Sequence, residues 1–190
     1  MSRPPAPPLL LASTSPRRRE ILEQLRIPFD VVAPDYEESE DDPVAHALGK
    51  ARSVLADADG RPVLGCDTEV LCDGRVYGKP SGPDETEEML ESLSGRTHEV
   101  VSGLALITPM WEEVRHETTR VTFRGLTPRD IARYVASGEW EGRAGGYAIQ
   151  GQGAALVTRI EGDYLNVVGL PTALLVRLLA ERFPGTYGFG

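Results

Sequence analysis

The sequence predicts an α/β fold in which a mixed β-sheet is flanked by helices. Short apolar runs typical of buried strands alternate along the chain with stretches whose apolar residues recur at helical spacing. That alternation is typical of α/β proteins. Hairpin patterns interrupt it at Asp73-Gly74 and between two strand-like runs within 99–123. Because hairpins add antiparallel pairs, we expect the sheet to be mixed.

The first elements are a strand, a helix and a second strand. Residues 9–12 are all apolar and predict a short buried strand. Ser13, Thr14 and Ser15 offer hydroxyls for the N-cap, and Pro16 suits the first helical turn, so we expect a helix over 16–26. Residues 29–32 then predict the next strand.

A longer helix and another strand follow. Apolar residues at helical spacing predict a helix over 43–58, and Lys50 lies on it. Residues 62–66 predict a strand that ends just before Asp67. The Asp73-Gly74 pair then indicates a tight hairpin.

The remaining elements repeat this mixture of helices, strands and loops. They are a helix over 84–93, strands over 99–108 and 113–123, a helix that Thr127 caps and that reaches 136, a glycine-rich loop over 139–153, a strand near 154–160, a loop over 162–171 and a helix over 172–182. Residues 1–8 are rich in proline and predict a disordered lead-in. We expect residues 9–190 to form a single domain.

The composition excludes several classes of protein. With 20 Lys and Arg against 29 Asp and Glu, the formal net charge is −9, which argues against a nucleic-acid or membrane partner. The two cysteines do not form a disulfide framework, and no apolar stretch is long enough for a signal peptide or a membrane span. We therefore expect a cytoplasmic protein.

Basic residues gather at the junction between the first strand and the first helix. Arg17 and Arg18 follow Ser13 and Ser15 there. A helix N-terminus offers free N–H groups to an anion, and arginines add directed donors, so the segment predicts a phosphate site. The alternative is a solvated basic turn.

Asp67 and Thr68 stand where α/β folds commonly bind ligands, just past the carboxyl end of a predicted buried strand. Such a carboxylate can bind a divalent cation or activate water. The alternative is an aspartate that caps a turn.

Four further side chains are candidates with weaker support. Lys50 and Lys79 could converge on a polyphosphate, or could be surface lysines. Glu37 and Glu38 could supply oxygen ligands to a metal, or could be solvated. The three histidines show no metal-ligand spacing and are interpreted as structural or exposed.

The glycine-rich stretch 144–151 contains the last candidate, Gln150. Glycines allow the backbone to approach a ligand closely, and an amide can both donate to and accept from the edge of a base. A glycine-rich stretch alone is weak support for a nucleotide site.

Taken together and in this order, these segments resemble the Maf family of nucleoside triphosphate pyrophosphatases. The resemblance covers roughly residues 9–180. The matching segments are Leu11-Ala12-Ser13-Thr14-Ser15-Pro16-Arg17-Arg18, Lys50-Ala51, Gly65-Cys66-Asp67-Thr68, Gly78-Lys79-Pro80, Leu93 to Val100, Ala144 to Gly151, and Gly162-Asp163-Tyr164 with Val168-Gly169-Leu170-Pro171.

The resemblance implies a fold like that of inosine triphosphate pyrophosphatases, with an elongated mixed sheet and a cleft between two lobes. It also implies a homodimer that uses Mg²⁺ or Mn²⁺. Asp67 would be the central acidic residue, holding the metal or acting as a base, and Glu38 the second carboxylate, with Glu37 as its rival. Arg17, Arg18, Lys50 and Lys79 would hold phosphates, and Ser13 or Ser15 would add hydroxyl contacts.

Two residues bear on the substrate. Thr68, in Asp67-Thr68, and Gln150, in Ile149-Gln150-Gly151, resemble the branch of the family that acts on dTTP and UTP. An amide such as Gln150 can pair with the O4/N3–H edge of a pyrimidine. The alternatives are the same reaction on 7-methyl-GTP or another modified nucleotide, and a non-enzymatic regulator of septum formation.

Overall fold

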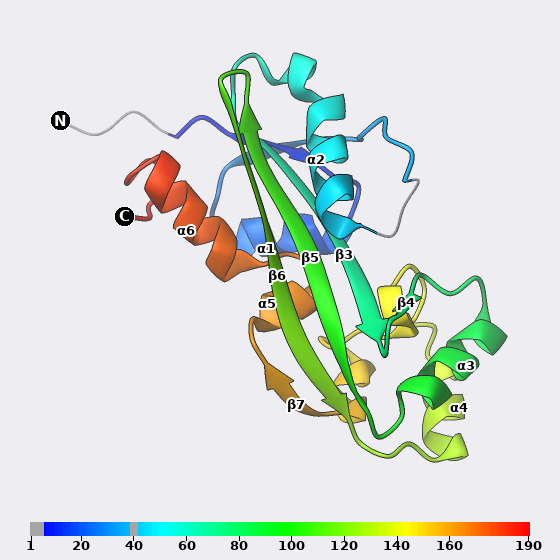
Figure 1. The fold of residues 1–190 in the computed structure, drawn as a ribbon. Coiled ribbons are helices and arrows are strands. Elements are labelled where there is room, and N and C mark those ends of the chain that lie inside the picture. The colour runs from blue at the N-terminus through cyan, green and yellow to red at the C-terminus, as the bar shows by residue number, and fades with distance from the viewer. Residues whose placement is uncertain (1–5, 39–41) are drawn as a thin grey trace. The chain divides into compact units, whose positions relative to one another are not determined.

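The computed structural model describes residues 6–38 and 42–190 and has the mixed α/β class that the sequence predicts (Figure 1). A seven-stranded sheet has the order β2-β1-β3-β5-β6-β7, and β4 pairs with β3. The strands are β1 (Leu9–Ala12), β2 (Phe29–Val32), β3 (Val63–Cys72), β4 (Arg75–Tyr77), β5 (Thr97–Thr108), β6 (Trp111–Phe123) and β7 (Val157–Glu161). The α-helices are α1 (Pro16–Gln24), α2 (Pro43–Ser53), α3 (Pro83–Leu93), α4 (Pro128–Ala136), α5 (Tyr164–Val168) and α6 (Thr172–Arg182).

Most predicted elements are present, with shifted ends. The predicted helix 43–58 is α2 only as far as Ser53, and a 3₁₀ helix over Leu55–Ala58 follows it. The predicted strand near 154–160 starts at Val157, after a 3₁₀ helix over Gln152–Leu156.

Two further elements also differ. The predicted strand 62–66 is too short, because β3 continues to Cys72, where its last residues pair with β4 in antiparallel register. Asp67 therefore lies inside β3 and not just beyond it, although the parallel pairing with β1 ends two residues earlier, at Gly65. The predicted loop 162–171 contains the short helix α5, whose start is fixed by a 2.8 Å hydrogen bond from the Leu165 N–H to Asp163 Oδ1.

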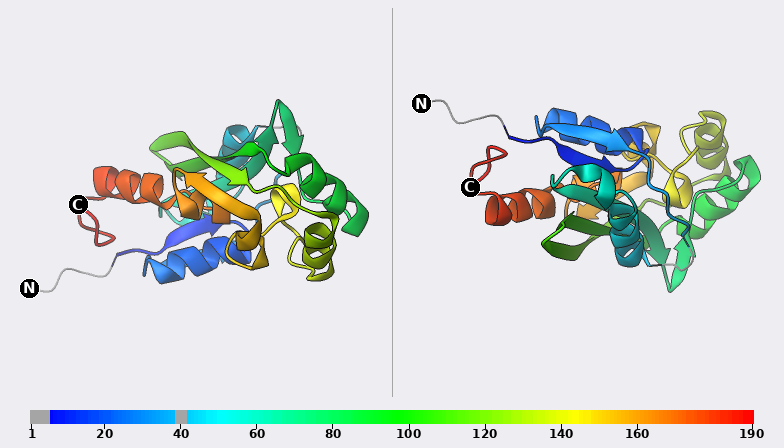
Figure 2. Two further views of the ribbon diagram at one scale, coloured as in Figure 1. Left: turned by 90° about the horizontal axis from the view of Figure 1, so that it is seen from below. Right: turned by 90° about the horizontal axis from the view of Figure 1, so that it is seen from above.

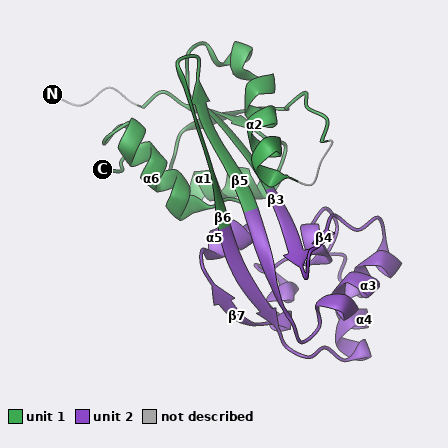
Figure 3. Cartoon of the chain, in the orientation of Figure 1, with its two compact units in different colours: residues 1–67, 102–117, 169–190 green, residues 68–101, 118–168 purple. Residues whose placement is uncertain are grey.

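The described chain divides into two compact units (Figure 3). Unit 1 comprises 1–67, 102–117 and 169–190, and unit 2 comprises 68–101 and 118–168. The predicted lead-in over 1–8 lies partly outside the described residues, since placement begins at residue 6. A single domain over 9–190 stays a prediction.

Unit 1 contains the parallel part of the sheet. β1 lies between β2 and β3, with Leu10 opposite Asp30 on one side and Val63 on the other. The apolar face of α2 packs on these strands and forms a core with few large side chains. That core consists of Leu10, Ala12, Ala47, Ala51, Val54, Ala58, Val63, Ala105 and Ile107.

The ends of the described chain meet on unit 1. Figure 2 shows the N-terminal segment beside the segment that follows α6, and the Tyr187 hydroxyl donates to the Pro7 carbonyl at 3.0 Å. Tyr187 itself is nearly buried, at 7% exposed.

Unit 2 begins with the hairpin of β3 and β4. Asp73 and Gly74 both have positive φ, +50° and +78°, as the type of turn predicted for this pair requires. Helix α4 begins with the expected cap, because the Thr127 hydroxyl accepts from the Asp130 N–H while the Asp130 carboxylate accepts from the Thr127 N–H.

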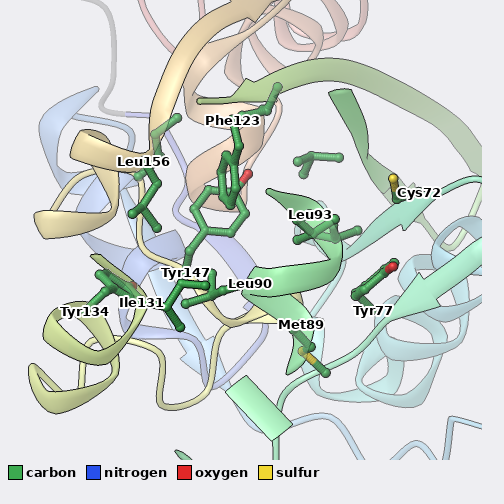
Figure 4. Close-up of a cluster of buried hydrophobic side chains, with 14 residues drawn as sticks. Cys72, Tyr77, Met89, Leu90, Leu93, Phe123, Ile131, Tyr134, Tyr147 and Leu156 are labelled. Atoms are coloured by element: carbon green, nitrogen blue, oxygen red, sulfur yellow. The ribbon is translucent and has the colours of Figure 1, made fainter. Parts of the chain in front are cut away.

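The core of unit 2 is rich in large side chains (Figure 4). Phe123 and Tyr147 pack edge to face with ring centroids 4.8 Å apart. His98 lies against both rings, only 1% exposed, and its Nε2 is 2.8 Å from the Tyr147 hydroxyl. Burial lowers the pKa of His98 to about 4.

None of the described helices combines the length and the hydropathy that a membrane crossing requires.

Candidate active site

Helix α2 carries one half of the candidate site to strand β3. Gly65 makes this close packing possible, because a Cβ at that position would lie 2.1 Å from the Ala47 carbonyl oxygen of α2. With the helix this close, Lys50 reaches Asp67: its Nζ donates to Asp67 Oδ1 at 2.5 Å. Both side chains are largely buried, with 11% of Lys50 and 13% of Asp67 exposed.

The segment that precedes α2 adds a second carboxylate. Tyr36 packs so closely on α2 that a Cβ at Gly49 would lie 2.1 Å from its ring. Two residues later, Glu38 Oε1 lies 2.5 Å from Lys50 Nζ, with 49% of its side chain exposed. Of the two adjacent glutamates that the sequence left open, Glu38 is the one that reaches Lys50.

His46 is the site residue that sequence reasoning missed. It is 4% exposed, and its Nδ1 lies 3.4 Å from Asp67 Oδ2. The available indication was its position four residues before Lys50, which places both side chains on one face of α2. The spacing between histidines along the sequence could not indicate this site, because the side chains close to His46 are carboxylates from other segments of the chain.

These side chains form a set that can accommodate a divalent cation. One ligand atom from each of Glu38, His46 and Asp67 lies within 4.8 Å of the others. Two carboxylates and an imidazole are common ligands of divalent metals. The Lys50 ammonium lies between the Glu38 and Asp67 carboxylates, so these two carboxylates already bind one positive charge.

The start of α1 brings Ser13 and Arg18 together. Ser13, 4% exposed, accepts hydrogen bonds from Arg18 Nη1 at 3.1 Å and from the Ser15 N–H at 3.2 Å. Arg18 Nε also donates to the Gly169 carbonyl at 3.0 Å, and Arg17 lies beside that glycine. Ser15 occupies the N-cap position, but within the described part of the chain its hydroxyl makes no capping hydrogen bond.

Three predicted residues belong to unit 2: Thr68, Lys79 and Gln150. Thr68 follows Asp67 in β3 and is half-buried, whereas Lys79 and Gln150 are exposed. The segments that carry the last two are joined by a hydrogen bond from the Gly145 N–H to the Gly78 carbonyl at 3.0 Å.

The loop that carries Gln150 is held on both sides of that residue. The Ala148 N–H donates to the Tyr134 hydroxyl at 2.8 Å, and the Gln152 N–H donates to Glu139 Oε2 at 2.7 Å. Burial raises the pKa of Tyr134 to about 12 and that of Tyr147 further, so both hydroxyls stay protonated at neutral pH. Gln150 is thus an exposed amide on a well-fixed loop.

Comparison with known proteins agrees with these motifs. The model of the family described as "Maf-like protein" matches residues 8–182. A protein of Gloeobacter violaceus named dTTP/UTP pyrophosphatase is 49% identical over 180 residues, which cover 91% of this chain and 95% of that protein. Proteins of the same name from Moorella thermoacetica and Deinococcus radiodurans are 51% and 44% identical over 181 and 191 residues, covering 90% and 97% of this chain and 93% and 97% of theirs.

The family model spans nearly all of the sheet and helices, including the cluster of Glu38, His46, Lys50 and Asp67 and the loop of Gln150. This chain therefore belongs to the Maf family.

Proposed function

We propose that this protein hydrolyses nucleoside triphosphates, dTTP and UTP first among them, to the monophosphate and pyrophosphate. The observation that carries the proposal is the position of Asp67, a largely buried carboxylate held by Lys50 inside the motif Gly65 to Thr68. The names of the similar proteins, all dTTP/UTP pyrophosphatase, support the same substrates.

The reaction needs a carboxylate site and a basic site. Water attacks the α-phosphorus, the bond from that phosphorus to the oxygen bridging to the β-phosphate breaks, and pyrophosphate leaves. Asp67 and Glu38 hold a divalent cation, Mg²⁺ or Mn²⁺, which when bound neutralises phosphate charge. Asp67 is alternatively the base that takes the proton of the attacking water.

The basic residues bind the polyphosphate in this proposal. Arg17 and Arg18 lie at the start of α1, where backbone N–H groups and the helix dipole also favour an anion. Ser13 orients Arg18, and Ser15 adds a hydroxyl. Lys50 and Lys79 hold further phosphate oxygens and the charge of the leaving pyrophosphate.

Gln150 and Thr68 select the base. A site built to pair with the O4/N3–H edge of a pyrimidine rejects a base that leaves the amide without a partner. The loop around Gln150 supports this role, because its hydrogen bonds at Ala148 and Gln152 fix the backbone from which the amide extends.

The direct test is pyrophosphate release from dTTP, UTP, dCTP, dGTP and 7-methyl-GTP, each with Mg²⁺, Mn²⁺ or EDTA. We expect release from dTTP and UTP that depends on the metal. Preference for 7-methyl-GTP would keep the reaction and overturn the role of Gln150. No release from any nucleotide by folded protein would overturn the proposed activity.

Asp67→Asn tests the central residue. It keeps the size of the side chain but removes its charge, so we expect turnover to fall by about 10²–10⁴-fold. The control is Asp84→Asn, which changes an exposed aspartate of α3 and should leave turnover unchanged. Near-normal turnover in a clean preparation of Asp67→Asn would rule out both roles of Asp67.

Two further properties follow from the resemblance and belong to this proposal: a homodimer and a cytoplasmic location. Sedimentation equilibrium of the full chain tests the first, with a mass of twice 20.7 kDa expected. A mass equal to one chain over the working concentration range would overturn it.

A further inference from the structure

The imidazole of His46 is a buried group that the proposed roles do not use. It lies on the face of α2 that also carries Lys50, and it is 4% exposed. The ring of Tyr36 packs edge-on against it, with centroids 6.0 Å apart and an interplanar angle of 63°. The aromatic contact and the burial hold the ring beside Asp67.

The two carboxylate oxygens of Asp67 have different neighbours, at different distances. Oδ1 accepts from Lys50 Nζ at 2.5 Å, a short charge-assisted hydrogen bond. Oδ2 faces His46 Nδ1 at 3.4 Å, which is long for a hydrogen bond between these groups. Two atoms that bind one metal at about 2.0–2.2 Å each lie about 3–4 Å apart, and 3.4 Å falls in that range.

Glu38 completes a set of donors from three separate segments. Its carboxylate comes from the segment before α2, the His46 imidazole from α2 and the Asp67 carboxylate from β3, and ligand atoms from all three lie within 4.8 Å of one another. Two carboxylates and Lys50 leave a net charge of −1, which favours an additional cation.

We propose that His46 Nδ1 is a third protein ligand of the catalytic cation, together with Glu38 and Asp67. This assignment rests on the proposed function, because the cation that His46 would bind is the one used in that reaction. An imidazole suits Zn²⁺ and the other late first-row metals best. Mn²⁺ prefers oxygen ligands but accepts an imidazole more readily than Mg²⁺, which favours oxygen ligands and retains its waters. The site therefore selects a first-row transition metal over Mg²⁺.

The structure also defines the competing interpretation. His46 could act only through a hydrogen bond that orients Asp67, in which case it would be a positioning residue. A positioning role affects both metals alike, because it works through the carboxylate that either ion would use. A ligand role affects mainly the metal that binds nitrogen well.

The experiment measures binding of Mn²⁺ and Mg²⁺ to the full chain by calorimetry, with and without a non-hydrolysable α,β-imido analogue of dUTP. His46→Gln keeps a polar side chain of similar reach but removes the imidazole. We expect His46→Gln to weaken the binding of Mn²⁺ by about tenfold or more, and the binding of Mg²⁺ by much less. The control is His116→Gln, at an exposed histidine of β6, which should change neither.

Pulsed electron paramagnetic resonance of bound Mn²⁺ tests the ligand directly. The wild-type protein and His116→Gln should show coupling to a directly bound ¹⁴N nucleus, and His46→Gln should lose it. Bound Mn²⁺ without ¹⁴N coupling, no Mn²⁺ binding under either condition, or equal weakening of both metals would overturn the proposal.

The experiments distinguish a failure of the His46 ligand from a failure of the proposed function. Nitrogen-coupled Mn²⁺ in a protein that releases no pyrophosphate would support the His46 ligand and overturn the activity. Metal-dependent hydrolysis with no nitrogen coupling would support the activity and overturn the His46 ligand.

Discussion

Lys50 illustrates how one residue can serve both stability and the proposed chemistry. Its Nζ lies 2.5 Å from carboxylate oxygens of both Glu38 and Asp67, and only 11% of its side chain is exposed. Without the ammonium, the largely buried Asp67 carboxylate would lose its closest cation. Removing one partner of such a pair costs more than the pair contributes, because a buried charge is left without compensation.

A double-mutant cycle tests this coupling. Lys50→Met should lower the free energy of unfolding by about 1–3 kcal/mol. Adding Asp67→Asn removes the uncompensated charge, so the double variant should be more stable than the sum of the two single effects predicts. Urea unfolding measures all four proteins, and simple additivity would contradict an interaction between the two side chains.

His98 makes stability depend on pH. Burial lowers its pKa from 6.5 to about 4, so between these values the unfolded chain binds a proton that the folded chain does not. Unfolding is therefore favoured as the pH falls through this window, by about 3 kcal/mol in total for this group. We expect His98→Gln to lose that part of the pH dependence of urea unfolding between pH 7.5 and 4.5. If the unfolding free energy of His98→Gln depends on pH as it does in the wild-type protein, other titratable groups cause that dependence.

At the scale of elements, the site depends on how closely α2 packs on β3. The contact is between the Gly65 backbone and the Ala47 carbonyl, in a core otherwise built largely of alanine and valine. Lys50 and His46 leave the helix from the same packed face, so the distance between helix and strand determines whether they reach Asp67.

Gly65→Ala tests this packing. The added Cβ would lie 2.1 Å from the Ala47 oxygen, so the helix must move away from the strand. We expect a loss of about 1–3 kcal/mol in unfolding free energy, together with reduced turnover. Gly125→Ala is the matched control, since a Cβ there meets nothing within 4 Å and its φ is not positive. Equal effects of the two variants would show that close packing at Gly65 is unimportant.

At the scale of the whole molecule, the acidic net charge of −9 opposes a polyphosphate substrate. The basic residues at the start of α1 and a bound cation offset this locally, so nucleotide and metal should bind together. The proposed function thus predicts that the nucleotide alone stabilises the protein little.

Thermal unfolding measures this coupling. With Mn²⁺ present, the α,β-imido analogue of dUTP at 100 times its Kd should stabilise the protein by about 2.7 kcal/mol. For a chain of this length, that raises Tm by about 5–10 °C. With EDTA in place of Mn²⁺ we expect almost no shift. An equal shift in EDTA would show that the nucleotide binds without the cation.

Local patterns in the sequence were sufficient to predict most of the fold. The apolar run of β1, the Asp73-Gly74 turn and the capped start of α4 each depend on residues that are neighbours in the chain. The hairpin at Asp73-Gly74 was predicted, but the continuity of its first strand with residues 62–66 and the short helix α5 were missed. The continuity follows from pairing with β4, and α5 from a side-chain cap by Asp163 inside a stretch rich in loop-forming residues.

The sequence by itself determined the fold class, the family resemblance and the motifs that contain Asp67, Lys50 and Gln150. Only the tertiary structure decided that Glu38 is the glutamate next to Lys50 and that His46 joins Asp67. Those contacts link segments 12 to 21 residues apart, and they exist because Gly49 and Gly65 let Tyr36 and β3 approach α2 closely. Such distances depend on packing between elements, which no local pattern of residues specifies.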